Sequence, residues 1–280
     1  MLNFSNKSYQ LKFNIINMAK KLQMNLIGFA PVERWEKYGE TDPEYYPQNI
    51  WPEVKSVIVL GTQIYLPMLE TTPSVVYSEL YNTANRILDE AAYKISNYLN
   101  VQKKQAFFFP RDCYGDISVL IEKPAAAFSQ VLAGKYAGLG TIGYNHTLIT
   151  KEFGPRVRLV SVLTNALLPP DPVLKKDLCI KCEMCRKCCP TSSFKTTENL
   201  IADMDKKKCA AYHAELKSAF CYPCGVCIKV CPIGEDRKVY GYDAKKYLGE
   251  REVLKRNKKD PEYAGWVHCR ELGSKTVQKL

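Results

Sequence analysis

The sequence predicts an α+β protein in which a mixed α/β domain precedes a small cysteine-rich module. Over the first 170 residues, segments with apolar residues at helical spacing alternate with short β-branched runs, which predicts the α/β domain. Two four-cysteine repeats of equal spacing follow, and they predict a module built around bound metal. A proline-rich stretch at 169–172 marks the boundary. We therefore expect an α/β domain over 1–170, the module over 171–240 and a basic tail over 241–280.

The first expected elements are a helix, a loop and a strand. Apolar side chains in 8–24 return at every third or fourth position, so they share one helical face. Residues 31–52 are rich in Pro and Tyr, and we expect an irregular loop there. The run Val54–Leu60 is apolar and β-branched and is followed by Gly61, which predicts a buried strand. The apolar face of the helix consists of Leu11, Ile15, Met18, Ala19 and Leu22.

A long helix and two further strands complete the expected α/β domain. The segment 79–99 has the apolar stripe of an amphipathic helix. A short strand is expected over Ala106–Phe109, followed by a helix over 124–137 with Pro124 in its first turn. Val157–Leu163 is again apolar and β-branched, which predicts another strand. The stripe of the long helix consists of Leu80, Ala84, Ile87, Leu88, Ala91, Ile95, Tyr98 and Leu99.

Composition indicates a soluble, cytoplasmic protein. Of 280 residues, 46% are hydrophobic and 25% are charged, as in ordinary globular proteins. No run reaches the roughly 18 uncharged apolar residues that a membrane span needs, so we expect no membrane partner. The N-terminus lacks the apolar core and cleavage site of a secretory signal. Twelve cysteines without an export signal indicate a reducing compartment, in which thiolates bind metals.

Positive charge is concentrated towards the C-terminus. The formal net charge is +11, and residues 237–280 hold 12 Lys and Arg against 6 Asp and Glu. A basic tail of this kind can bind a phosphate backbone or an acidic electron donor. The alternative interpretation is a solvated helix face that aids solubility. The tail includes Lys255, Arg256, Lys258 and Lys259.

The two cysteine repeats carry the strongest functional signal. Each reads C-x2-C-x2-C-x3-C-P, the pattern of bacterial two-cluster ferredoxins, in which three thiolates bind one 4Fe–4S cluster and the fourth binds the other. Structural zinc sites use paired C-x2-C knuckles, and a chain of this length needs no disulfide scaffold. The sequence therefore predicts two 4Fe–4S clusters and electron transfer. The repeats are Cys179, Cys182, Cys185 and Cys189, and Cys221, Cys224, Cys227 and Cys231.

A glycine motif before the repeats has the spacing of a dinucleotide-binding turn. Gly138, Gly140 and Gly143 spell G-x-G-x-x-G, which in a dinucleotide fold follows a strand and precedes an acidic residue about 20 positions on. Here a helix-like segment precedes the motif, and no Asp or Glu lies between 153 and 170. We therefore expect these glycines to permit close approach of the backbone to a flat group or to another chain segment.

The order of segments resembles a known pair of families. Asp116–Glu122, Lys123-Pro124 and Ala137–Gly143 precede the double cysteine motif, as in the epoxyqueuosine reductases and, more distantly, the corrinoid-dependent reductive dehalogenases. The resemblance runs from about residue 55 to 236. It implies a nitroreductase-like α/β domain that holds a cobalamin beside two 4Fe–4S clusters. It also implies a reductase that takes electrons from an external ferredoxin or flavodoxin, with tRNA as a candidate partner.

The resemblance assigns roles to individual residues. Asp116 matches the catalytic acid, although from sequence alone an Asp there is more often a turn residue or a helix cap. A working acid near neutral pH needs a raised pKa, which burial against a corrin face would supply. The turn that lines the corrinoid matches Gly140, Thr141, Ile142 and Gly143. Two positions depart from the family pattern, since Trp is usual at Thr141 and Lys is usual at Tyr144.

The resemblance also adds a cysteine to the cluster ligands. In the family a lone cysteine, matched by Cys209, ligates the second cluster, whereas ferredoxin spacing assigns that iron to Cys221. Both candidates stand at this point. The first cluster takes Cys179, Cys182, Cys185 and Cys231 on either interpretation, and the second also takes Cys189, Cys224 and Cys227.

The substrate and the class of protein each have an alternative. Epoxyqueuosine reductases continue into a helical-repeat region that helps to hold tRNA, and about 50 residues follow the last cluster cysteine here. The substrate is therefore epoxyqueuosine in tRNA or a smaller molecule. The alternative to an enzyme is a two-cluster electron carrier or partner subunit without its own catalysis, for which an α/β domain of this size would be superfluous.

Overall fold

A four-stranded antiparallel sheet forms the centre of the molecule. The computed structural model describes residues 4–256 and 268–275. The strand order is β1-β2-β6-β3, and the register pairs Val59 of β2 with Ser161 of β6. Both central strands are almost completely buried, as expected for apolar, β-branched segments covered on two faces. The strands are β1 (Leu26–Pro31), β2 (Ser56–Gln63), β3 (Ala106–Phe109) and β6 (Val157–Thr164).

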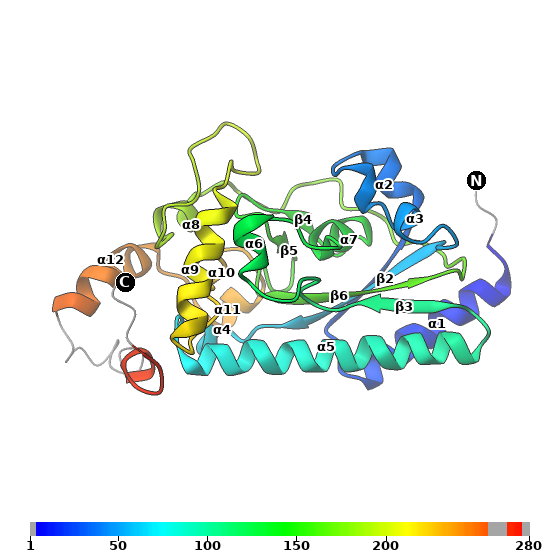
Figure 1. The fold of residues 1–280 in the computed structure, drawn as a ribbon, viewed down its shortest axis with the longest axis horizontal. Coiled ribbons are helices and arrows are strands. Elements are labelled where there is room, and N and C mark those ends of the chain that lie inside the picture. The colour runs from blue at the N-terminus through cyan, green and yellow to red at the C-terminus, as the bar shows by residue number, and fades with distance from the viewer. Residues whose placement is uncertain (1–3, 257–267, 276–280) are drawn as a thin grey trace.

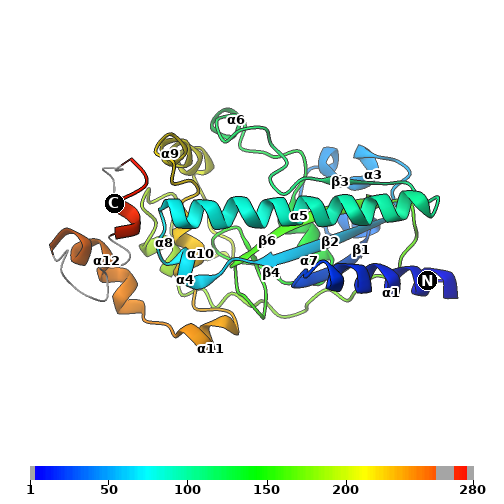
Figure 2. The ribbon, with the colours of Figure 1, turned by 90° about the horizontal axis from the view of Figure 1, so that it is seen from below.

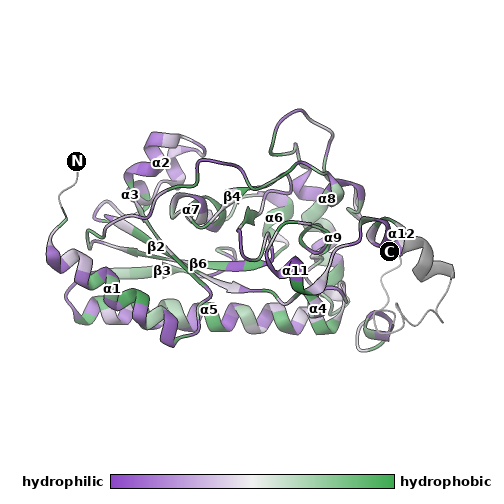
Figure 3. Cartoon of the chain, turned by 180° about the vertical axis from the view of Figure 1, so that it is seen from behind, coloured by the Kyte–Doolittle hydropathy of each residue, from purple (hydrophilic) through white to green (hydrophobic). Residues whose placement is uncertain are grey.

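Helices cover both faces of this sheet. The helices α1 (Asn6–Lys21) and α5 (Val75–Val101) lie together on one face, and α2 (Glu33–Tyr38) and α7 (Gln130–Tyr136) lie on the other (Figures 1 and 2). Alternate residues of each strand enter two separate cores, because successive side chains point to opposite faces. Polar and apolar residues alternate along α5, as an amphipathic helix requires (Figure 3). In β2, for example, Val57 faces the core with α7.

Serine caps determine where three helices begin. Ser5, Ser74 and Ser129 accept hydrogen bonds from backbone N–H groups in the first turns of α1, α5 and α7. The expected helices over 8–24 and 79–99 and the three expected strands are confirmed. The helix expected over 124–137 is shorter, because it begins only after the cap at Ser129.

The expectation of an irregular loop over 31–52 is wrong in part. This stretch contains α2, the 3-10 helix η1 (Pro43–Tyr45) and α3 (Pro47–Ile50), and two of its prolines, Pro43 and Pro47, lie at the starts of the last two. The strand β1 and the small hairpin β4 (Thr141–Ile142) and β5 (Leu148–Ile149) had no sequence signal strong enough to predict them.

The cysteine-rich segment, residues 179–231, lies at one end of the sheet, opposite the start of α1 (Figure 1). Arg156 anchors it, because its buried guanidinium donates to both carboxylate oxygens of Asp236 at 2.6 Å and to the carbonyl of Cys231 at 3.0 Å. The short elements around it are α4 (Leu66–Leu69), α6 (Val119–Glu122), α8 (Met184–Lys187), α9 (Lys206–Ser218), α10 (Val226–Lys229), α11 (Asp236–Tyr240) and α12 (Ala244–Arg256).

The mixed helix-and-sheet fold is thus confirmed, and the division at residues 170 and 240 stays a prediction. The side chains of Lys255, Arg256, Lys258 and Lys259 lie outside the described residues. Within the described ranges, no helix combines the length and the apolarity needed to cross a membrane.

Candidate functional site

The structure sorts eight of the twelve cysteines into two sets. A small cavity of about 20 Å³ is lined by four of them, which we call the first set. A larger cavity is lined by four others, the second set. The first set combines three cysteines of the first repeat with one of the second. The second set combines two cysteines of the second repeat with one of the first and one from outside the repeats. The first set is Cys179, Cys182, Cys185 and Cys231, and the second is Cys189, Cys209, Cys224 and Cys227.

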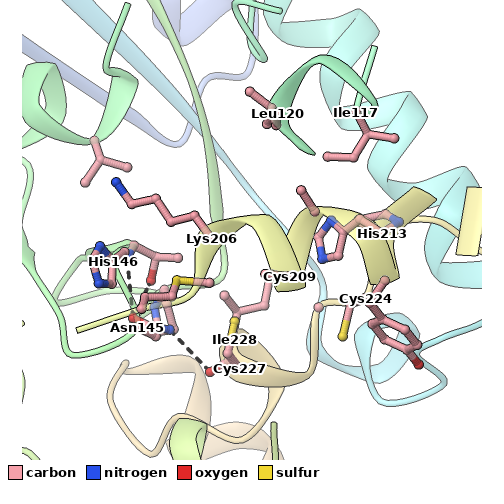
Figure 4. A pocket seen from close by; sticks show the side chains of 18 of the residues that line it. Ile117, Leu120, Asn145, His146, Lys206, Cys209, His213, Cys224, Cys227 and Ile228 are labelled. Carbon is pink, nitrogen blue, oxygen red and sulfur yellow. Dashed lines mark hydrogen bonds between the residues drawn. The ribbon is translucent and has the colours of Figure 1, made fainter. Parts of the chain in front are cut away.

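Cys221 belongs to neither set. It is buried and lines neither cavity, and its Sγ donates to the carbonyl of Leu216 at 3.7 Å. Cys209, in contrast, lies on α9 and faces the larger cavity together with Cys224 and Cys227 (Figure 4). Of the two candidates that the sequence left open, the geometry therefore favours Cys209.

Tight turns present the thiols of both sets. Lys181 and Glu183 adopt left-handed backbone conformations between the cysteines of the first repeat, and Gly225 does so in the second, with φ of +67°. A side chain at Gly225 would strike the ring of Tyr77, because a Cβ there would lie 2.6 Å from Cε1. The turn of the second repeat therefore packs directly against the start of α5.

Burial and neighbouring thiols both raise the pKa values of Cys185 in the first set and Cys209 in the second. Burial, reinforced by Cys231 and Cys182, raises the pKa of Cys185 to about 12. Burial and the charge of Cys189 raise the pKa of Cys209 to about 11. Burial alone raises the pKa of Cys221. Deprotonating four thiols in one buried space is unfavourable unless a positive metal core compensates their charge.

The thiol arrangement does not suit a single metal ion. A tetrahedral zinc site at about 2.3 Å per ligand brings its sulfur atoms within about 4 Å of one another. Among the described residues, no three Cys, His, Asp or Glu side chains form a group that could hold one ion. Four thiols line each of the two cavities, which is the number of ligands that a 4Fe–4S cluster takes, so the residues present fit the expected groups.

The larger cavity has a volume of about 430 Å³ and lies between the sheet and the cysteine-rich segment. Its walls come from β6, α5, α9 and the loop over 110–124. Figure 4 shows the side chains of Cys209, Cys224 and Cys227 on one side and Ile117 and Leu120 of this loop on the other. Most of the lining is apolar or aromatic, which is typical of sites for organic cofactors. The lining thus fits the reacting part of a corrinoid, while the rest of so large a cofactor would extend beyond this space.

A network of tyrosines and charges lines one wall of the cavity, and sequence reasoning missed it. Tyr81 donates to Asp112 at 2.7 Å, and Arg158 pairs with the same carboxylate while its guanidinium lies 4.5 Å from the centre of the Tyr81 ring. The hydroxyls of Tyr114 and Tyr222 are 3.0 Å apart. Burial raises the pKa of both phenols, so they stay protonated and can donate hydrogen bonds.

Asp116 lies outside this cavity. Its side chain is 40% exposed, forms an ion pair with Lys217 of α9 and accepts from the backbone and hydroxyl of Ser118 at 2.9 and 2.7 Å. The hydrogen bond from Lys217, then those from Ser118, hold the pKa of the carboxyl well below its ordinary value. The expected burial and raised pKa are therefore not found in this conformation. The role of Asp116 as an acid stays a prediction.

Asp116 nevertheless lies in the loop over 110–124, which forms part of the wall of the larger cavity. It lines an adjoining cavity of about 250 Å³, which shares several wall residues with the larger one. These shared residues are Arg111, Tyr114, Ile117 and Tyr222.

The glycine motif packs against other parts of the chain, as expected. A Cβ at Gly138, whose φ is +76°, would lie 2.2 Å from the carbonyl oxygen of Pro172, and one at Gly140 would lie 2.2 Å from that of Ile149. Thr141 is buried and its hydroxyl accepts from the backbone of Leu178 at 2.9 Å.

None of Gly140, Thr141, Ile142 and Gly143 lines the larger cavity, whereas the next residues, 145–148, do. Tyr144 is buried and donates to the carbonyl of Lys195 at 2.7 Å. Contact between the glycine turn and a corrinoid therefore stays a prediction.

Comparison with known proteins relates the chain to two groups of enzymes. No family model matches it. It is 31% identical over 175 residues to a tetrachloroethene reductive dehalogenase of Desulfitobacterium hafniense, which covers 61% of this chain and 27% of that protein. It is 28% identical over 226 residues to an epoxyqueuosine reductase of Bacillus cereus, which covers 74% of this chain and 57% of the relative. The chain thus spans between about a quarter and a little over half of the length of these relatives.

Solved structures show the same fold. An epoxyqueuosine reductase crystallised with an epoxyqueuosine-modified tRNA stem loop superposes with a TM-score of 0.57 at 21% identity, covering 80% of this chain and 65% of that one. A B12-dependent reductive dehalogenase superposes with a TM-score of 0.63 at 18% identity, covering 96% of this chain and 37% of that one. The relatives in sequence are oxidoreductases, and this chain is similar in sequence and fold to epoxyqueuosine reductases and reductive dehalogenases.

Proposed function

We propose that the chain is an iron–sulfur, corrinoid-dependent reductase that receives electrons from an external ferredoxin or flavodoxin. When bound, two 4Fe–4S clusters supply one-electron carriers and a cobalamin supplies the metal centre that reduces the substrate. The single observation that carries this proposal is the grouping of the cysteines. All four thiols of the second set border the larger cavity, so a cluster held there would lie beside whatever the cavity binds.

The chain's own residues would perform three tasks. The first set and the second set hold the two clusters, each with four thiols and without a ligand from Cys221. The apolar wall excludes water from the reacting face of the bound cofactor. The protonated phenols of Tyr114 and Tyr222 keep hydrogen-bond donors at the wall, where a substrate can reach them.

Asp116 is our proposed proton donor, and this role requires a movement of its loop. Its carboxylate would leave Lys217 and turn towards the cavity that Ile117 already lines. Without Lys217 and in a drier environment, the pKa of the carboxyl rises, which an acid at neutral pH needs. A solved structure of the Bacillus subtilis epoxyqueuosine reductase has its catalytic aspartate loop swung out of the active site. We propose that the present conformation corresponds to that open arrangement.

The relatives suggest two substrate classes. Epoxyqueuosine in tRNA is the first, because one related structure holds an epoxyqueuosine-modified stem loop. A small chlorinated molecule is the second, because a tetrachloroethene reductive dehalogenase is among the relatives. For tRNA, the basic residues after position 237 would bind phosphates, and binding should weaken steeply as salt increases. We further propose a cytoplasmic location, since none of the twelve cysteines forms a disulfide.

Turnover decides between these classes. The protein, reconstituted anaerobically with iron, sulfide and cobalamin, is supplied with a low-potential reductant and either substrate. Conversion of epoxyqueuosine to queuosine in tRNA, or release of chloride from tetrachloroethene, supports a reductase. The absence of both reactions, with clusters and cobalamin bound, would exclude these two substrates and point to a different substrate for the same chemistry.

A further inference from the structure

The first and second cysteine sets differ in how they face the solvent. All four residues of the first set are partly exposed, whereas Cys189 and Cys224 of the second set are buried. The second set borders the larger cavity, whereas the first set lines a separate cavity of only about 20 Å³. An external electron donor can therefore approach the first set most closely.

The chain around the first set has an apolar centre. Ile180, between two cysteines of the first set, is 65% exposed, and Leu174 is 40% exposed. An exposed isoleucine in a metal-binding loop contributes nothing to the core. Exposed apolar side chains surrounded by charges are typical of protein interfaces.

Basic residues flank Ile180 on both sides in the sequence. Residues 174–187 hold five Lys and Arg against two Asp and Glu. Glu183 is paired with Arg186 at 2.8 Å, which leaves Asp177 as the one carboxylate outside an ion pair in that stretch. The lysines are Lys175, Lys176, Lys181 and Lys187, of which Lys181 donates to the carbonyl of Glu198 at 2.7 Å.

We propose that this surface, made of Leu174, Lys175, Lys176, Ile180, Lys181 and Lys187, docks an acidic electron-transfer protein of the flavodoxin or ferredoxin class. The proposal rests on the proposed function, because it assigns the entry point for the electrons. The donor loses one electron and the cluster held by the first set gains it, with no bond made or broken and no proton moved. Charge complementarity selects an acidic protein and raises the association rate at low salt.

A charge-reversed pair tests the surface. In Lys175→Glu/Lys176→Glu, two exposed charges change sign without touching a cysteine. The matched control is Lys103→Glu/Lys104→Glu, two adjacent exposed lysines after the far end of α5, which at 27 residues is about 40 Å long. Iron content is measured first, so that both variants are compared with intact clusters.

Two readouts are followed with a reduced, acidic bacterial flavodoxin as the probe. One is the second-order rate of cluster bleaching in stopped flow, and the other is the affinity for oxidised flavodoxin by titration calorimetry. We expect the Lys175/Lys176 variant to slow reduction about tenfold or more at low salt, to weaken binding in parallel and to lose most of the salt dependence. The control variant keeps the wild-type rate and affinity, and a small photochemical reductant reduces all three proteins equally.

Other outcomes overturn specific parts of this account. Equal rates and affinities for both variants and the wild type, with intact clusters, would refute the docking surface and leave the proposed function standing. Equal losses in both variants would mean a general charge effect and would refute it as well. Failure of the small reductant to bleach the wild type, or absence of iron, would refute the proposed function itself.

Discussion

Cys209 and Cys221 form a matched pair for testing the second set, because both are cysteines near α9 and one of them lines the larger cavity. Replacing Cys209 with serine removes one of four ligands from that set. The first set keeps all of its own thiols, so iron should fall from about eight to about four per chain. Replacing Cys221 with serine should leave about eight irons, because its Sγ only meets the carbonyl of Leu216 at 3.7 Å and a hydroxyl can donate to the same oxygen.

The assay is iron and sulfide analysis after anaerobic reconstitution, together with electron paramagnetic resonance of the reduced proteins. Wild type and Cys221→Ser should both show two cluster signals, and Cys209→Ser should show one. The stability of Cys221→Ser should fall by at most about 1 kcal/mol, the usual scale of one hydrogen bond. Iron loss in Cys221→Ser with about eight irons in Cys209→Ser would refute the grouping and restore the plain ferredoxin ligand set.

Three further predictions follow from particular side chains. Arg156→Met leaves the buried carboxylate of Asp236 unpaired, so the free energy of unfolding should fall by about 3–5 kcal/mol. Lys94→Met, which removes an exposed ion pair with Glu90, should cost less than about 1 kcal/mol. Similar thermal midpoints for the two variants would contradict this prediction. Asp116→Asn should slow turnover about a hundredfold or more with iron content unchanged. Lys217→Met should raise the pKa of the Asp116 carboxyl, which would shift the pH–rate profile to higher pH. An unchanged rate in the first variant and an unchanged profile in the second would remove both residues from the mechanism. Burial lowers the pKa of His213 to about 4, so the stabilising contribution of the neutral ring is complete above its unfolded pKa of about 6.5 and is lost as the pH falls to 4. The thermal midpoint of the wild type should therefore drop more between about pH 6.5 and 4 than that of His213→Gln. Parallel curves of thermal midpoint against pH would disprove this.

The sequence predicted the main helices and strands because their signals are local. The stripe in 79–99 and the β-branched runs around Val59 and Val160 need no knowledge of the rest of the chain. The missed strand β1 is short, and its apolar run directly follows a helix of similar hydrophobicity. The small helices in 31–52 depend on prolines at their first turns, which also mark loops, so composition could not separate the two.

The site was predictable only where spacing in the chain reflects spacing in the fold. The two repeats predicted metal binding, but ferredoxin spacing points to Cys221, which does not line the cavity that the second set borders. The wall formed by Tyr81, Tyr114 and Tyr222 joins three distant segments, so no local pattern marks it. Likewise the pairing of Asp116 with a lysine 101 positions later reverses the expected direction of its pKa shift.

Cobalamin binding by the iron-loaded protein is the most direct test of a corrinoid reductase. We predict saturable changes in the visible spectrum with a dissociation constant of micromolar or tighter, equivalent to at least about 8 kcal/mol. Leu120→Arg, which places a charge in the larger cavity, should abolish this binding, whereas Val119→Arg should not, because Val119 is 48% exposed and outside the cavity lining. Absence of binding by a wild-type protein that carries both clusters would contradict the account and identify the chain as an electron carrier.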